Sequence, residues 1–147
     1  MNSESISGFF LAQQSGNVKV AKSPALKVSI FRYDLAKKAV IGEAIATDIT
    51  VMLDTGANVS SLDKSYLTGL EPAGHVGVTK MDRREVLDFY IIAFRVAGLP
   101  HNYIAMVAAA EITSAKKSFS GLLGMDFIQN FKMSLDYKAG IVNLEPT

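Results

Sequence analysis

Asp54 is the residue of this chain whose type and position best suit a role in catalysis. It follows the apolar residues 51–53 and precedes Thr55, Gly56 and Ala57. A carboxylate where a buried strand meets a glycine turn needs a reason, because burial disfavours its ionised form. One interpretation is structural: Asp54 opens an Asx turn, which the permissive backbone of Gly56 helps to form. The other is catalytic, since a carboxylate in this position can act as a general acid or base.

A second apolar segment with a glycine lies nearer the C-terminus. Leu122, Leu123 and Gly124 precede residues 125–131, in which a short helix is expected. Together with the Asp54 motif, this segment resembles the paired signature of the retropepsins, the single-domain aspartic peptidases of bacteria and retroelements. The two signatures occur in the family's order, and the resemblance extends over nearly the whole domain.

The resemblance implies a fold and a role for each matching residue. The fold is mostly β, a closed pepsin-like (retropepsin) half-barrel with one or two short helices. Asp54 matches the catalytic carboxylate, Thr55 would hold its hydroxyl against a partner subunit's loop, and Gly56 would let the backbone approach substrate. Ala57 stands where pepsin-like relatives often carry a hydroxyl. Gly124 would let the last apolar segment pass behind the catalytic loop.

The single copy of the Asp54 motif bears on assembly, because pepsin-like enzymes carry two copies in one long chain. The resemblance therefore implies a homodimer in which a twofold axis brings two Asp54 side chains together. Two adjacent carboxylates hold one proton between them and titrate as a coupled unit. The ionised member can activate a water, and the protonated member can donate to the scissile carbonyl of a polypeptide. The predicted function is that of an aspartic endopeptidase, which needs no metal or cofactor.

A hairpin is predicted between the two signatures, over residues 75–96, where retropepsins place a flap that closes over substrate. Its tip is expected at Lys80, Met81, Asp82, Arg83 and Arg84. Retropepsin flaps usually carry glycine at the tip, so these charges predict a narrower choice of substrate or a site that stays partly open. The alternative is an ordinary solvated hairpin turn.

Composition argues against several other classes of protein. The 147 residues carry a formal net charge of +1, so no long-range field draws the chain to nucleic acid or anionic lipid. With no cysteine and two histidines, a disulfide framework, a thiolate nucleophile and a cysteine-ligated zinc site are excluded. The longest apolar stretch, residues 89–99, is shorter than the ~18–20 residues that cross a bilayer. No signal peptide is recognised, and a soluble domain of undetermined location is expected.

Hydrophobic periodicity predicts one domain over residues 25–147, preceded by a flexible arm or an irregular first strand over residues 1–24. Leu26, Val28 and Ile30 alternate with their neighbours as in a half-buried strand. Further strands are expected at residues 39–46, 49–54, 75–81, 85–96, 102–108, 132–137 and 141–144, with a short helix from about residue 60 to 69.

Three alternatives to the peptidase remain open. Ser61 and Lys64 have the spacing of some serine acylases, but the partner motifs of that class are missing and helix capping explains the serine. A noncatalytic dimer module could keep the same fold and use its groove to hold a peptide. A structural domain could use Asp54 only to organise a turn, and replacement of Asp54 would then leave function untouched.

Overall fold

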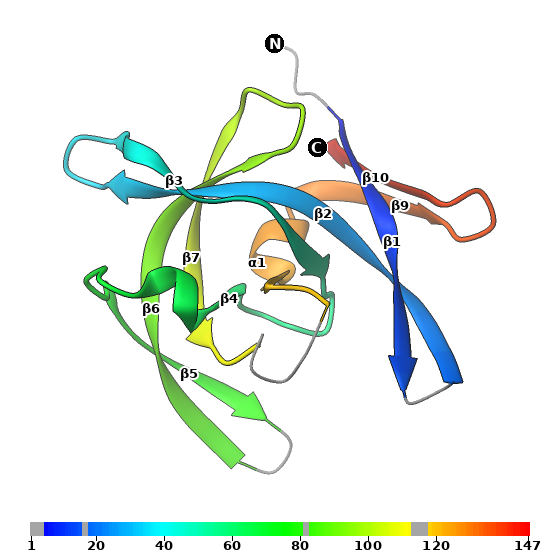
Figure 1. Cartoon of the computed structure of the whole chain (residues 1–147), viewed down its shortest axis with the longest axis horizontal. Helices are drawn as coiled ribbons and strands as arrows, with labels where there is room; N and C mark the ends of the chain where they lie inside the picture. The colour runs from blue at the N-terminus through cyan, green and yellow to red at the C-terminus, as the bar shows by residue number, and fades with distance from the viewer. Residues whose placement is uncertain (1–4, 16–17, 81–82, 113–117) are drawn as a thin grey trace.

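The computed structural model describes residues 5–15, 18–80, 83–112 and 118–147 (Figure 1). Within these residues the chain is almost entirely β-strand, with one 3-10 helix, η1, and one short α-helix, α1. The strands are β1 (Ile6–Ser15), β2 (Val18–Asp34), β3 (Ala39–Leu53), β4 (Ser61–Asp63), β5 (Gly74–Lys80), β6 (Arg83–Val96), β7 (Asn102–Ala110), β8 (Gly121–Leu123), β9 (Phe131–Asp136) and β10 (Ile141–Pro146). The helices are η1 (Lys64–Leu67) and α1 (Met125–Ile128).

Six of the strands close into a barrel. Their order is β2-β3-β8-β4-β7-β6, and the ring closes because β6 also pairs with β2. Two of the contacts are parallel, β3 with β8 and β4 with β7, and the other four are antiparallel. The predicted mostly β closed barrel with very few helices is therefore confirmed. Outside the ring, β5 pairs with β6, while β1, β10 and β9 extend the sheet from β2 (Figure 1).

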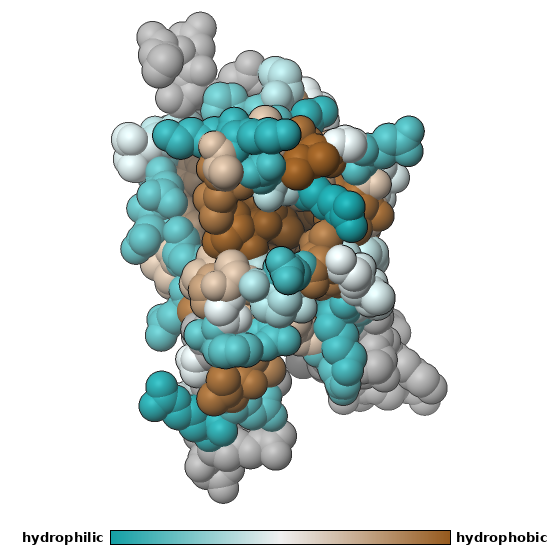
Figure 2. Space-filling model, turned by 90° about the vertical axis from the view of Figure 1, so that its left-hand side faces the viewer, coloured by the Kyte–Doolittle hydropathy of each residue, from teal (hydrophilic) through white to brown (hydrophobic). Residues whose placement is uncertain are grey.

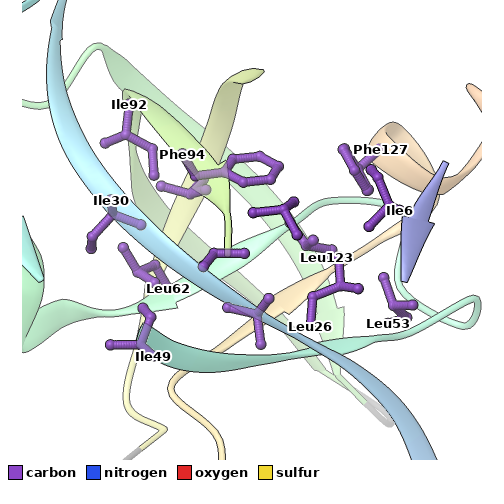
Figure 3. Packing of buried hydrophobic residues seen from close by; sticks show 14 of the residues in the cluster. Ile6, Leu26, Ile30, Ile49, Leu53, Leu62, Ile92, Phe94, Leu123 and Phe127 are labelled. Carbon is purple, nitrogen blue, oxygen red and sulfur yellow. The ribbon is translucent and has the colours of Figure 1, made fainter. Parts of the chain in front are cut away.

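The barrel interior is filled by alternate residues of its strands. Leu26, Val28 and Ile30 of β2 are at most 2% exposed, which confirms the predicted period-2 pattern. On β6, the three consecutive residues Ile92, Ala93 and Phe94 are all buried. Figure 3 shows side chains of β2 and β6 gathered in one interior with residues from β3, β4, β8 and α1. Burial of this apolar surface is the main force that closes the ring.

Two alternatives were expected for residues 1–24, a flexible arm or an irregular first strand, and residues 6–15 form a strand, β1. β1 pairs antiparallel with β10, where Ile6 lies opposite Leu144, and then with β2. Both of these side chains are fully buried. Gly8 allows the close approach, because a Cβ there would lie 2.4 Å from the carbonyl oxygen of Ala25. The strand is held by partners far along the chain, which a local pattern does not reveal.

Two local elements also differ from the expectation. β3 runs as one strand where two are expected, and Asp48, with a left-handed φ of +51°, lies at their junction. The helix expected from about residue 60 begins only at Lys64, because the residues before it pair as β4. Asp63 caps this helix by accepting a hydrogen bond from the Ser65 N–H at 3.1 Å.

Hydrophilic side chains cover most of the face toward the β2–β3 hairpin, and apolar side chains gather in a hollow near its centre (Figure 2). On this side of the molecule a cavity of about 390 Å³ lies between β2–β3 residues such as Tyr33 and Ile41 and the segment after η1, including Leu70. No helix in the described part of the chain is long and apolar enough to cross a membrane.

Candidate active site

Asp54 stands at the C-terminal end of β3, where the barrel strand gives way to an exposed loop. The preceding Leu53 is buried, Asp54 itself is half-buried, and Thr55 and Gly56 are exposed. One carboxylate oxygen, Oδ1, accepts a hydrogen bond from the Gly56 N–H at 2.9 Å, and the Ala57 N–H donates to the Asp54 carbonyl at 3.2 Å. This is the Asx turn that the structural interpretation expects. Within the described residues Oδ2 accepts no hydrogen bond, so the turn uses one oxygen of the carboxylate.

The two sequence signatures meet behind this loop. β8 lies parallel to β3, and the Asp54 N–H donates to the Leu123 carbonyl at 2.9 Å. One turn further, the Met125 N–H donates to the Ala57 carbonyl at 2.7 Å. Gly124 lies between these bonds and is buried; a Cβ there would stand 2.6 Å from the Ala57 carbonyl oxygen. The close passage expected at Gly124 is thus what the backbone geometry requires.

A buried side-chain network also holds the loop, and sequence reasoning assigned it no role. Ser60, 1% exposed, donates its hydroxyl to Asp126 Oδ1 at 2.7 Å and accepts from the Gly124 N–H at 3.0 Å. Asp126 also accepts from the Ser60 N–H at 3.0 Å and from the Phe127 N–H at 2.9 Å. The carboxylate therefore joins the end of the loop to the start of α1. A serine and an acid flanking the two signatures were visible in the sequence, but their 66-residue separation gave no sign that they meet.

The loop forms one wall of a cavity of about 450 Å³, and the β5–β6 hairpin forms another. From the loop and β8 come Gly56, Ala57, Asn58, Val59, Ser61 and Leu122; from the hairpin come Gly77, Thr79 and Leu87; from β7 and the residues after it come Ala108, Ala110, Glu111 and Ile112. The expected hairpin between the signatures is present, and described residues of its two strands line the cavity. A cavity of this volume lies within the usual range of ligand sites in proteins.

The predicted flap tip is only partly described. Lys80 and Arg83 pair at the end of the hairpin, while Met81 and Asp82 lie outside the described residues. The guanidinium of Arg84 lies beside Gly77, where a Cβ would come within 2.7 Å of it.

A second network holds the segment after β7, which lines the same cavity. The carboxylate of Asp63, 3% exposed, accepts from the Ile112 N–H at 2.8 Å and from the Ser65 hydroxyl. The neighbouring Glu111 forms an ion pair with Lys64 on the molecular surface. The hydrogen bond and charge of Glu111 raise the pKa of Lys64 above its ordinary value.

This ion pair bears on the serine acylase alternative. Such a mechanism needs a neutral lysine beside the serine as its base. Lys64 instead bonds Glu111, and its raised pKa keeps it protonated at neutral pH. Ser61 lines the cavity described above, whereas Lys64 lines a separate one beside η1. The geometry therefore disfavours a Ser61–Lys64 nucleophile.

The histidines lie away from the loop. His75 Nδ1 is 2.8 Å from Asp88 Oδ1 across the β5–β6 hairpin, with both side chains exposed. His101 lies against the ring of Tyr103. Among the described residues there is no group of three or more His, Asp and Glu side chains that could hold a metal ion.

Comparison with protein-family models and with curated proteins gives no match. Among solved structures, the Simian foamy virus (mac) protease is 18% identical with a TM-score of 0.48, over 71% of this chain and 91% of its own. A retropepsin-like aspartic protease from Rickettsia conorii is 14% identical with a TM-score of 0.47, over 98% of this chain and 96% of its own. The foamy viral protease-reverse transcriptase, solved with an RNA/DNA hybrid, is 19% identical with a TM-score of 0.48, over 76% of this chain and 13% of that much longer chain.

All three identities are below 20% and all three TM-scores are below 0.5, so the comparison adds no argument about this chain. The closed barrel and the passage of β8 behind the Asp54 loop are features of this chain's own structure. The function proposed below rests on these two features.

Proposed function

We propose that this chain is an aspartic endopeptidase whose active form is a homodimer with one Asp54 from each subunit. The observation that carries the proposal is the position of Asp54, half-buried at the end of β3 with its backbone bonded to β8 and one carboxylate oxygen bonded to Gly56. The loop that follows and the β5–β6 hairpin both border the cavity of about 450 Å³, which we take as the substrate groove. A fixed carboxylate beside such a groove is the arrangement that acid–base hydrolysis of a peptide needs.

The chemistry follows from two carboxylates in one centre. The ionised Asp54 takes a proton from a water molecule as the water oxygen attacks the scissile carbonyl carbon. The partner's Asp54, protonated, donates to the carbonyl oxygen as the tetrahedral intermediate forms. Collapse of that intermediate breaks the C–N bond: Asp54 gives the proton it took from water to the leaving amine, and the partner's Asp54 takes a proton back from a hydroxyl of the intermediate, whose oxygen becomes the new carboxyl carbonyl. Both carboxylates return to their starting states.

A dimer is required because each chain supplies one carboxylate of this kind. The loop residues Thr55, Gly56 and Asn58 are exposed in the single chain, as a surface that meets a second copy must be. A closed twofold assembly places the same loop on both sides of its axis. The hydroxyl of Thr55 would then lie against the partner's loop.

The first prediction is that Asp54→Asn abolishes hydrolysis, with a loss of at least about 10²–10⁴-fold in kcat, because the amide cannot exchange a proton. The melting temperature should stay close to the wild-type value, since the amide oxygen can still accept from the Gly56 N–H. Peptide cleavage and thermal unfolding of the purified variant provide the measurement.

Asp136→Asn is the matched control. Asp136 makes the same kind of turn bond, accepting from the Ala139 N–H at 3.0 Å on the exposed β9–β10 turn. The two variants lose the same charge. Equal activity of both would mean that Asp54 only organises a turn. Loss of cleavage with retained peptide binding in Asp54→Asn supports the peptidase. Peptide binding without cleavage in the wild type would instead favour the noncatalytic binding module.

The second prediction is that specific activity falls as the protein is diluted through its dimer dissociation constant, because mass action removes the species that holds both carboxylates. Well below that constant, specific activity should fall in proportion to concentration. Sedimentation velocity on the same samples gives the dimer fraction. Full specific activity in a sample that sediments as monomer would contradict the shared centre.

A further inference from the structure

The groove beside the Asp54 loop has an uneven distribution of charge. Of the described residues that line the cavity, Glu111 is the charged one, and the others are apolar or neutral polar. It lies directly after β7, next to the buried Ile112. Its side chain is 64% exposed, so the carboxylate stays hydrated and ionised while it borders an otherwise uncharged wall.

The backbone beside Glu111 is held by a hydrogen bond to the buried Asp63. The Ile112 N–H donates to Asp63 Oδ1 at 2.8 Å, and Asp63 is 3% exposed. The same carboxylate accepts from Ser65, so the segment after β7 is tied to the start of η1. The acidic side chain thus projects from a backbone position that is set before any peptide arrives, which lowers the ordering cost of a contact with it.

Lys64 is one partner of Glu111, and this exposed ion pair can exchange with another cation. Lys64 reaches the carboxylate from η1, outside the residues that line the groove, and its side chain is 61% exposed. An ion pair with this much solvent exposure contributes little net free energy, because the ammonium and the carboxylate are both well hydrated when they are apart. A carboxylate has several acceptor positions and can bond a second cation while it keeps the first.

We propose that Glu111 makes this wall of the groove a subsite for a basic side chain, so that a lysine or arginine of the substrate peptide contacts Glu111 while neighbouring apolar side chains occupy the rest of the cavity. This inference rests on the proposed function, whose substrate class it narrows. A peptide carrying an acid at the same position meets a like charge and binds less well. The preference for a basic side chain should therefore apply to one position of the peptide and should not follow the net charge of the whole peptide.

The test is a set of peptides around one cleavable core, in which Arg, Gln and Glu are placed in turn at each position flanking the scissile bond. At one position the wild type should show kcat/KM for Arg about 3- to 10-fold above that for Glu, the range expected of a partly exposed charge contact. Glu111→Gln should bring this ratio close to one. Lys64→Met should raise it, because the competing cation is gone. The preference should weaken as salt is added.

Glu43→Gln is the matched control, because Glu43 is exposed on β3 and the variant changes the net charge by the same amount. A preference that disappears equally in Glu43→Gln and Glu111→Gln, or that persists in Glu111→Gln, would overturn the subsite. So would cleavage by the wild type with no position-specific preference.

Binding of the same peptides to the Asp54→Asn variant, measured by fluorescence anisotropy, separates this inference from the proposed function. If no peptide is cleaved by the wild type but Arg peptides bind in a Glu111-dependent way, the subsite stands and the peptidase fails. If peptides are cleaved but bind without regard to charge, the peptidase stands and the subsite fails.

Discussion

The Asp54 loop and the β5–β6 hairpin face each other across the groove and are held in opposite ways. The loop is tied to β8 and α1 by backbone bonds and by the buried Ser60–Asp126 network. The hairpin is attached through β6, with β5 at the edge of the sheet, and it carries exposed side chains such as Val86, 70% exposed. The difference indicates that interior contacts fix the loop that carries the Asp54 carboxylate. The β5–β6 hairpin depends mainly on its own strand pairing.

The comparison is tested most strongly by removing one side-chain contact from each region. Asp126→Ala leaves the buried Ser60 hydroxyl and N–H without their charged acceptor, so a loss of about 3 kcal/mol in unfolding free energy is expected. Asp88→Asn removes the exposed His75–Asp88 pair of the hairpin, for which about 0–1 kcal/mol is expected. Urea unfolding of both variants measures the difference. Equal losses would mean that the hairpin is fixed as firmly as the loop.

A pair of glycine substitutions gives the next largest contrast. In Gly124→Ala the new Cβ meets the Ala57 carbonyl oxygen at 2.6 Å, and since backbone must move, a loss of about 1–3 kcal/mol is expected. In Gly77→Ala the Cβ meets only the far end of the Arg84 side chain, which can turn away, so a change within about 0.5 kcal/mol is expected. Thermal and urea unfolding would detect the gap. A destabilisation by Gly77→Ala as large as that by Gly124→Ala would contradict the assigned difference between the regions.

The smallest effect is expected from Val86→Thr on the hairpin. The side chain is 70% exposed and the substitution keeps its β-branched shape, so unfolding free energy should change by less than about 0.5 kcal/mol. Leu53→Ala, which truncates a buried side chain directly before the Asp54 loop, serves as the interior reference and should cost about 2–5 kcal/mol. Comparable losses in the two variants would show that Val86 has a packing role that its exposure does not indicate.

Much of the fold follows from patterns that are local in sequence. Alternation at Leu26, Val28 and Ile30 predicts a half-buried strand, and the structure has one, because alternate side chains of any strand point to one face. The β5–β6 and β9–β10 pairs likewise match strands expected at neighbouring positions of the sequence, and in each pair the two strands run antiparallel. The loop and β8 come together as the paired signature implies.

Other features depend on residues that are distant in sequence. β1 is a strand because β10, at the far end of the chain, and β2 both pair with it, whereas the local composition of residues 1–24 left a flexible arm and an irregular strand as alternatives. A helix was expected from about residue 60, but the Ser60 hydroxyl donates to Asp126, 66 residues away, and Asp63 caps η1. A polar side chain takes whichever partner satisfies it when buried, and that partner is set by packing.

The sequence by itself determined a mostly β chain, an acid at the end of an apolar strand and a glycine-containing segment to pass behind it, because periodicity and turn chemistry operate between near neighbours. Tertiary structure decided that the ring closes through β6 and β2, that Ser60 and Asp126 lock the loop, and that Glu111 borders the groove. Those outcomes require side chains and strands dozens of residues apart to satisfy one another's hydrogen bonds and exclude water together, and only the folded chain brings them within reach.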